Sequence, residues 1–311
     1  MKGCGLFKVR VKRLPLTLVA VAVIAIVALE IFRAGAGENF TEFESGAQYN
    51  ADSDITLNED RPASLFLPAN YSAETPVPLL INLHGYTGKG SVHSSYTYLQ
   101  VAAKEKGLAY VAPDGTEDSL RSQFWNASTA CCNFNGVDVD DVAYIKSLID
   151  EASSLVAIDP KRIYLFGHSN GHFMSYKFAC STNGVVAAVA GLAGAMDNNF
   201  DNCTKSPTNI LHIHGTSDQT ILYNGGALFQ KPYPSVDQSL AQWSEINSCT
   251  NPSEKDFDLM QSMVGSETTN RTYSCTKADL ELWRINNGLH TPTLDREFAN
   301  KVLDWLLARK L

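Results

Sequence analysis

The fold of this chain is indicated by the stretch RIYLFGHSNG, which occupies residues 162–171. Residues 162–166 have the composition of a buried strand, and a helical pattern starts at Asn170. Between them lies a G-x-S-x-G pattern centred on Ser169. A serine on a sharp turn between a strand and a helix exposes its hydroxyl above the sheet. We therefore predict that Ser169 is a nucleophile rather than part of a solvent-facing Gly/Ser turn.

Strands and helices alternate on both sides of this stretch, which predicts an α/β fold with a mostly parallel central sheet and helices on both faces. The predicted strands are residues 77–83, 108–112, 162–166, 185–192, 210–214 and 280–285, and the predicted helices are residues 98–106, 137–157, 170–180 and 294–308. Such sheets carry their chemistry in the loops at the carboxyl ends of the strands. Those loops are residues 84–90, 114–136, 167–172, 215–226 and 286–293.

A serine nucleophile needs a general base, and the base needs an acid that orients it. Three histidines lie beyond residue 172. His212 and His214 alternate within a predicted strand, so we interpret them as core or sheet-edge residues. His290 follows the last predicted strand directly, at the place where a catalytic loop belongs. We therefore predict that His290 is the base.

The orienting acid should lie between the serine and the histidine along the chain. Asp218 follows the predicted strand 210–214 in the sequence His-Gly-Thr-Ser-Asp. Asp201 lies in a polar loop, and Asp237 opens a predicted helix, where a capping role is sufficient. We therefore predict that Asp218 completes the triad.

Acyl transfer also needs backbone N–H groups that stabilise the oxyanion of the tetrahedral intermediate. One should come from Asn170, the residue after the nucleophile. The other should come from the loop after His84-Gly85, at Tyr86. His84-Gly85 could be a simple strand end, but together with the Ser169 turn we interpret it as part of an oxyanion hole.

The motifs as a set resemble the exported esterases grouped as polyhydroxybutyrate-depolymerase-like and feruloyl-esterase-like. They are Leu83-His84-Gly85, Trp125-Asn126 with Cys131-Cys132, Val139-Asp140-Asp141-Val142, Ile158-Asp159-Pro160-Lys161-Arg162-Ile163-Tyr164, Gly167-His168-Ser169-Asn170-Gly171 with Ala179-Cys180, His212-Ile213-His214-Gly215-Thr216-Ser217-Asp218, Tyr223-Asn224-Gly225-Gly226, Trp243 with Asn247 and Cys249, and Asn287-Gly288-Leu289-His290. The resemblance implies an α/β-hydrolase fold and a serine-esterase mechanism with the triad given above. This chain departs from the family at His172, where glycine is usual, and at Pro292, where an aromatic residue is usual.

Aromatic residues in the loop 114–136 favour small or aromatic acyl esters, such as feruloyl or acetyl esters of polysaccharide. Flat rings can sandwich an aromatic acid, although Phe124, Trp125 and Phe134 could equally pack the loop around Cys131-Cys132. We predict a substrate pocket that includes Phe124, Trp125, His172 and Tyr223.

Several other functions stay open at this stage. A polyhydroxybutyrate or other polyester depolymerase would use the same triad, as would a serine peptidase or a thioesterase. A lipase with a lid is disfavoured because no long apolar insert is present. A non-catalytic binding domain on the same fold is a further alternative of a different class.

The N-terminus has the features of an export signal. Basic residues precede an uncharged apolar run, residues 14–29, and the small residues Ala34-Gly35-Ala36 follow it. We predict a signal peptide or signal anchor at residues 1–36, a loose segment at 37–60 and the catalytic domain at 61–311. The protein would then be secreted or periplasmic, or anchored in a membrane with the domain outside the cytosol.

Composition excludes some partners. The formal net charge is −8 although the leader is basic, so nucleic acid and anionic membrane surfaces are unsuitable partners. No cofactor motif and no Cys/His cluster of zinc-site spacing is present, so we expect neither a cofactor nor a metal. The expected partner is an ester substrate, either free or bound to polysaccharide or polyester.

Six of the seven cysteines follow the leader, as expected for disulfides in an exported chain. We predict a bond between Cys249 and Cys275, because they flank a polar segment just before the last predicted strand. The remaining pairs are drawn from Cys131, Cys132, Cys180 and Cys203, in an order that the sequence leaves open.

Overall fold

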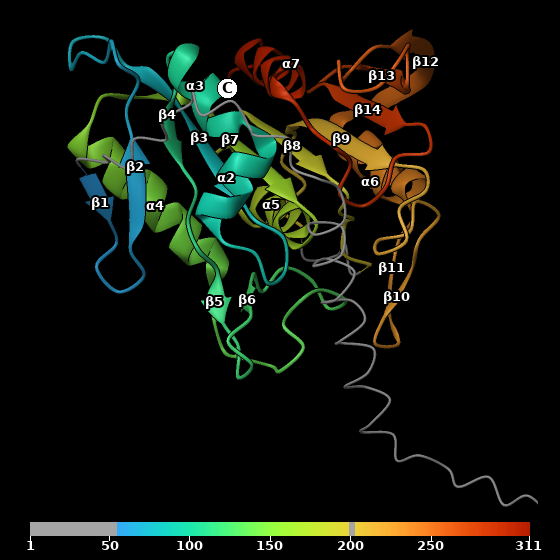
Figure 1. Ribbon diagram of the computed structural model, residues 1–311, viewed down its shortest axis with the longest axis horizontal. Coiled ribbons are helices and arrows are strands. Elements are labelled where there is room, and N and C mark those ends of the chain that lie inside the picture. Colours follow the sequence, from blue (N-terminus) through green and yellow to red (C-terminus); the bar gives the residue numbers. More distant parts are fainter. Residues whose placement is uncertain (1–54, 199–202) are drawn as a thin grey trace, which may run out of the picture. The chain divides into compact units, whose positions relative to one another are not determined.

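The computed structural model describes residues 55–198 and 203–311, and all of these lie in one compact unit (Figure 1). The predicted leader 1–36, most of the predicted loose segment 37–60 and Asp201 lie outside the described residues. Within the described ranges, no helix has the length and apolar character needed to cross a membrane.

A ten-stranded sheet forms the centre of this unit. Its strands are β1 (Ile55–Leu57), β2 (Ala63–Phe66), β3 (Val77–Leu83), β4 (Ala109–Val111), β7 (Ile158–His168), β8 (Ala188–Leu192), β9 (Asn209–Gly215), β12 (Cys249–Phe257), β13 (Thr268–Cys275) and β14 (Leu280–Ile285). Their order is β1-β2-β4-β3-β7-β8-β9-β14-β13-β12. The six strands from β4 to β14 are parallel, and antiparallel pairs extend the sheet at both edges.

Helices cover both faces of the sheet (Figure 1), which confirms the predicted architecture. They are α2 (Gly90–Thr97), α3 (Leu99–Glu105), α4 (Asp141–Leu155), α5 (Asn170–Ser181), α6 (Val236–Asn247) and α7 (Arg296–Leu307). The side chains of β3 alternate between two apolar clusters: Leu79 and Ile81 pack with α4, α5 and α6, whereas Leu80 packs with α3 and α7. Burial on both faces explains why this strand is apolar at every position except Asn82.

The structure corrects the predicted start of the folded domain. Strand β1 pairs with β2 and begins at Ile55, so the ordered sheet starts before residue 61. The residue that caps α6 also differs from the expectation. Ser235 caps this helix through a capping box with Gln238, and Asp237 lies inside its first turn.

The antiparallel edge formed by β12 and β13 has no counterpart among the predicted strands. Apart from Cys249, Pro252 and Phe257 the residues of β12 are polar, and almost all are exposed, so they carry no hydrophobic alternation from which a strand could be recognised. Helix α2 likewise has no counterpart among the predicted helices, because it is rich in serine and threonine and has no clear apolar face. The loop 116–136 holds a small two-stranded hairpin, β5 (Thr116–Glu117) with β6 (Gln123–Phe124), and a second hairpin joins β10 (Gly226–Leu228) to β11 (Lys231–Tyr233).

Three disulfides lie in the described part of the chain. Cys249 is bonded to Cys275, which is the predicted pair, and the two residues face each other in the register of β12 and β13. Cys180 is bonded to Cys203 at the end of α5, and Cys131 to its neighbour Cys132. The Cys249–Cys275 bond therefore closes the antiparallel hairpin that covers the outer side of β14.

We predict that the double variant Cys249→Ser/Cys275→Ser is less stable than the natural protein by about 3 kcal/mol, because opening the loop restores conformational freedom to the unfolded chain. Urea unfolding at neutral pH measures this difference. Cys180→Ser/Cys203→Ser is the matched comparison, since its bond joins residues 23 apart, close to the separation of 26 for Cys249–Cys275. The prediction fails if the first variant unfolds at the same urea concentration as the natural protein.

Candidate active site

Ser169 occupies the strained turn that the sequence predicts. It lies between β7 and α5 with φ 54° and ψ −120°, a conformation that costs a residue with a side chain roughly 1–3 kcal/mol. The flanking glycines are sterically required. A Cβ at Gly167 would lie 2.2 Å from the Gly171 carbonyl oxygen, and one at Gly171 would lie 2.1 Å from the Leu83 oxygen. Ser169 itself is 8% exposed and lies at the carboxyl end of the central strands.

Asp218 and His290 are joined directly. The His290 Nδ1–H donates to Asp218 Oδ2 over 2.8 Å. The other carboxylate oxygen, Oδ1, accepts the backbone N–H groups of Thr220 and Ile221 at 2.8 and 2.9 Å. Burial alone would raise the pKa of Asp218, but hydrogen bonds from His214 and His290 outweigh it and hold the pKa well below its usual range. Asp218 is therefore ionised at neutral pH and fixes the tautomer of His290.

The loop that carries His290 is attached to the Ser169 turn. His168, the residue before Ser169, donates its Nε2–H to the carbonyl oxygen of His290 over 3.0 Å, and the two rings lie 5.0 Å apart. Within the described residues Ser169 Oγ makes no hydrogen bond to His290. Catalytic hydrogen bonds are often long in ligand-free enzymes and shorten when substrate binds. The structure thus brings the three predicted triad residues to one edge of the sheet.

The predicted oxyanion hole has two unpaired donors beside Ser169. The backbone N–H groups of Tyr86 and Asn170 have no acceptor among the residues that the structure describes. A Cβ at Gly85 would lie 3.3 Å from the Cβ of Ser169, so the loop that carries Tyr86 adjoins the nucleophile. Two free donors next to a serine are suited to a developing negative charge.

Trp125 connects the two segments that supply these donors. Its backbone N–H donates to Asn170 Oδ1 over 2.7 Å, and Asn170 Nδ2 donates to the Trp125 oxygen over 3.0 Å. The indole Nε1–H donates to the His84 carbonyl oxygen over 3.0 Å. Trp125 is fully buried and Phe124 is 1% exposed. The prediction that these two rings line the substrate pocket is therefore corrected: they pack the interior beneath the loop that carries Tyr86.

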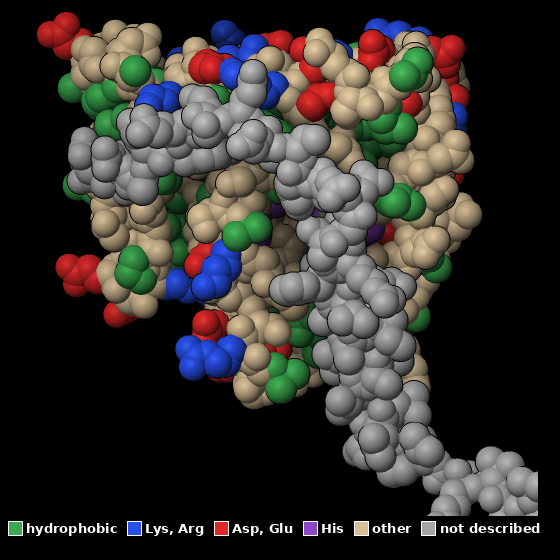
Figure 2. Space-filling view, in the orientation of Figure 1, with side chains coloured by type: hydrophobic (Ala, Val, Ile, Leu, Met, Phe, Trp, Pro, Cys, Tyr) green, Lys and Arg blue, Asp and Glu red, His purple; other side chains and the backbone are tan. Residues whose placement is uncertain are grey.

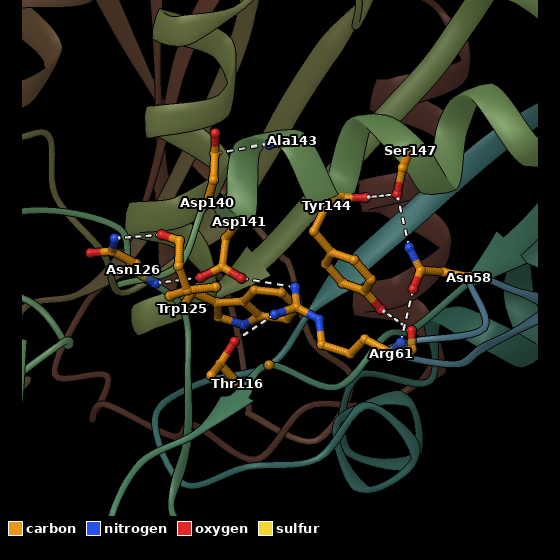
Figure 3. A network of polar contacts seen from close by, with 12 residues as sticks. Asn58, Arg61, Thr116, Trp125, Asn126, Asp140, Asp141, Ala143, Tyr144 and Ser147 are labelled. Atoms are coloured by element: carbon orange, nitrogen blue, oxygen red, sulfur yellow. Dashed lines mark hydrogen bonds and ion pairs between the residues drawn. The ribbon is translucent and has the colours of Figure 1, made fainter. Parts of the chain in front are cut away.

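An ion pair between Arg61 and the buried Asp141 lies next to Trp125 (Figure 3). Asp141, the first residue of α4, accepts Arg61 Nη2–H over 2.8 Å and the backbone N–H of Asn126 over 2.6 Å. The Arg61 guanidinium carbon lies 3.3 Å from the centre of the Tyr144 ring. The sequence alone gives Arg61, Asn126, Asp141 and Tyr144 no catalytic role, although Asn126 and Asp141 lie in segments shared with the family. The network ties the loop 116–136 to α4 and to the segment after β1.

His172 also lies in the interior instead of lining a pocket. It is fully buried, and its Nδ1 accepts the backbone N–H of Gly194 over 3.0 Å. A Cβ at Gly191 would lie 2.0 Å from His172 Cδ2, so the ring occupies space that two glycines leave free. Tyr223, the remaining predicted pocket residue, is half-buried and its ring meets the edge of His214 at 5.7 Å. Tyr223 therefore lies against His214, and His172 lies in the interior next to His212.

All seven histidines of the chain lie around this site, and histidine side chains are visible in the hollow at the middle of the face in Figure 2. Burial lowers the pKa of five of them, His84 among them. For His93, His172 and His212 the pKa lies well below the ordinary value, and for His168 it falls to about 3. These imidazoles are therefore neutral in the folded protein. Within the described ranges no cluster of three or more His, Cys, Asp or Glu side chains is arranged to hold a metal ion.

The parallel sheet, the helices on both faces and the serine turn between β7 and α5 define an α/β-hydrolase. The chain belongs to the phospholipase/carboxylesterase family, whose sequence profile matches residues 71–255. Among solved structures it is similar to an acetyl xylan esterase from Aspergillus awamori, with a TM-score of 0.59 and 14% identity over 79% of this chain and 93% of that one. This likeness shows a shared fold.

Two relatives are 31% and 30% identical to this chain over part of its length. Feruloyl esterase B of Piromyces equi is 31% identical over 192 residues, which cover 59% of this chain and 35% of that protein. A probable feruloyl esterase C of Aspergillus niger is 30% identical over 171 residues, 53% of this chain and 58% of that protein. The chain thus matches only part of each relative's length.

We predict that the protein loses stability as the pH falls below about 6.5, the pKa of an unfolded histidine. Because burial depresses the folded-state pKa values, the unfolded chain takes up protons first on acidification. The stability is complete above about pH 6.5 and is lost through a window that reaches about pH 3 for His168. Within this window, each such histidine should lower the free energy of unfolding by about 1.4 kcal/mol for each pH unit of acidification.

Urea unfolding between about pH 7.5 and pH 5 tests this prediction. His93→Phe is the comparison, because it removes one buried imidazole that is stacked on His168, and its stability should fall less steeply with pH. Equal stability of the natural protein across this range would contradict the prediction.

Proposed function

We propose that this protein is a serine esterase that hydrolyses carboxylic esters through an acyl-enzyme. Ser169 is the nucleophile, His290 the general base and acid, and Asp218 the residue that orients His290. The observation that carries the proposal is the strained turn at Ser169 with two unpaired backbone N–H groups beside it. The feruloyl esterases and the acetyl xylan esterase to which the chain is similar support the same class of reaction.

The chemistry follows from the positions of these groups. Asp218 accepts the Nδ1–H of His290, which leaves Nε2 free to take the proton of Ser169 Oγ as this oxygen attacks the ester carbonyl. The N–H groups of Tyr86 and Asn170 receive the oxyanion. His290 then returns the proton to the departing alcohol oxygen, and the acyl-enzyme forms. In the second half, His290 takes a proton from water, the hydroxide attacks the acyl carbonyl, and Ser169 regains its proton as the acid leaves.

An aromatic cluster beside the oxyanion loop favours aromatic acyl groups. The Tyr86 ring meets the edge of Phe134 at 5.4 Å, and Phe134 meets Phe229 at 4.7 Å. The Tyr86 hydroxyl donates to Asp118 Oδ2 over 3.2 Å, which fixes its ring. Phe229, at the tip of the β10–β11 hairpin, is 54% exposed. We infer that this cluster, rather than Phe124 and Trp125, receives the acyl ring, and that feruloyl-type or acetyl-type esters of polysaccharide are the substrates.

A polyester such as polyhydroxybutyrate is the second candidate substrate. The exposed apolar side chains Leu222 and Leu289 favour it, at 44% and 55% exposure. Leu222 follows Asp218 closely in the chain, and Leu289 precedes His290. Together with Phe229 they could rest on an apolar polymer surface.

Export is part of the same proposal. Three disulfides in the described residues support an oxidising compartment, in agreement with the leader predicted from the sequence. We propose that the protein is secreted or periplasmic, or anchored in a membrane by that leader.

Replacing the nucleophile tests the mechanism. Ser169→Ala should fold normally and should lower kcat for p-nitrophenyl acetate by about 10⁴-fold or more, because triad members act as a unit. Ser181→Ala, an exposed serine at the far end of the same helix, should keep full activity. Only the natural protein and Ser181→Ala should react with a serine-directed fluorophosphonate. A folded Ser169→Ala protein with full activity would rule out this nucleophile, and an inactive, unlabelled natural protein would favour a binding domain.

A second variant tests the acyl preference. Phe229→Ala should lower kcat/KM for methyl ferulate about two- to twelvefold, the loss of one aromatic contact, and should leave phenyl-free acetyl esters nearly unaffected. Phe229→Tyr keeps the ring and should retain the natural rate. Equal losses on both esters would contradict the assignment, and clearing of a polyhydroxybutyrate film without ferulate hydrolysis would support the polyester instead.

A further inference from the structure

A row of buried polar side chains leads to Asp218 from the side away from solvent. Tyr176 of α5 contacts His212 Nδ1 with its hydroxyl at 2.7 Å. His212 Nε2 lies 3.1 Å from His214 Nδ1, and His214 Nε2 lies 3.2 Å from Asp218 Oδ2. The three side chains, here called the Tyr176 row, are each at most 1% exposed. The sequence alone predicts that His212 and His214 are plain core or sheet-edge residues.

The hydrogen bonds of the row have one direction when its imidazoles are neutral, as imidazoles ordinarily are above about pH 7. His214 Nε2 faces only acceptors, the Ile221 carbonyl oxygen at 2.8 Å and the ionised Asp218, so this nitrogen carries the hydrogen. His214 Nδ1 is then an acceptor, and His212 must donate from Nε2. His212 Nδ1 in turn accepts the Tyr176 hydroxyl. Every donor in the row therefore points toward Asp218.

We propose that His214, backed by His212 and Tyr176, is a positioning residue for the Asp218–His290 pair. This inference rests on the proposed esterase function. Asp218 Oδ2 accepts the Nδ1–H of His290 at 2.8 Å and lies 3.2 Å from His214 Nε2, whose single N–H it shares with the Ile221 carbonyl oxygen. His214 also holds the Ile221 oxygen, and the Ile221 N–H binds Asp218 Oδ1. One imidazole thus fixes the carboxylate directly and through the turn that supports it.

The neighbours of the row leave it little freedom to rearrange. The His172 ring lies 4.3 Å from Tyr176 and 4.8 Å from His212, and Tyr223 covers the edge of His214. A buried polar chain is stabilising only when its members are paired, and each member here is paired with the next. Because His214 is 1% exposed, it does not touch substrate, and its effect should be on the orientation of His290 in the transition state.

Four variants of His214 and Tyr176 separate positioning from packing. Glutamine can place its amide nitrogen where His214 Nε2 lies, facing Asp218, whereas asparagine can place it only near Nδ1, facing His212. Leucine keeps apolar volume but supplies no donor. His214→Leu and His214→Asn should lower kcat for p-nitrophenyl acetate about 10- to 100-fold with KM almost unchanged, as for a lost hydrogen bond to a charged group. His214→Gln should recover most of kcat, and Tyr176→Phe should lose only about two- to fivefold.

Proton NMR gives a readout that does not depend on the substrate. The natural protein should show a downfield signal from the His290 Nδ1–H, absent in His290→Ala. The signal should shift or broaden in His214→Leu and His214→Asn and should be restored in His214→Gln. The proposal is overturned if His214→Leu keeps the natural kcat and signal, or if glutamine and asparagine behave alike. If the natural protein does not hydrolyse esters but the signal changes in the His214 variants as described, the proposed function is refuted and the positioning role of His214 is kept.

Discussion

The site depends on one buried carboxylate that has to stay ionised. Asp218 is 4% exposed, and a charge in such a place is tolerated only when its oxygens are hydrogen-bonded. Four donors meet this requirement, and they come from the turn after β9, from His214 inside β9 and from the loop after β14. The adjacency of β9 and β14 in the sheet brings these segments together. Satisfying the charge and positioning His290 are therefore the same structural task.

A second buried carboxylate organises the opposite side of the site. Asp141 is fully buried and is paired with Arg61, which lies on the Tyr144 ring. Its other partner is the backbone of the loop that carries Trp125. Through Trp125, that loop holds the His84 end of β3 and the Asn170 end of α5 at a set spacing. The positions of the two unpaired N–H groups beside Ser169 thus depend on an ion pair that is remote from Ser169. This is because a backbone donor can be positioned only together with the segment that carries it.

Between these two charges the interior is built from neutral polar groups. Burial keeps five of the surrounding histidines uncharged, namely His84, His93, His168, His172 and His212. This arrangement limits positive charge near His290, which would oppose the protonation of His290 in the proposed mechanism. It also makes the folded state sensitive to acid, because protonation of a buried ring is coupled to unfolding.

The sequence alone determined those features whose signal lies within one element or one turn. The apolar runs of the parallel strands, the glycine-flanked Ser169 and the strand-end positions of Asp218 and His290 can be recognised locally, since backbone conformation and burial on both faces dictate the residue types. The same holds for the backbone donors at Tyr86 and Asn170. Only the tertiary structure decided which side chains meet. Trp125 and His172 turned inward, and His214 joined Asp218, because segments distant in the chain pack there and Gly191 and Gly194 leave room for a ring. Residue type does not indicate the direction or the neighbours of a side chain; those follow from how the sheet and its helices close around it.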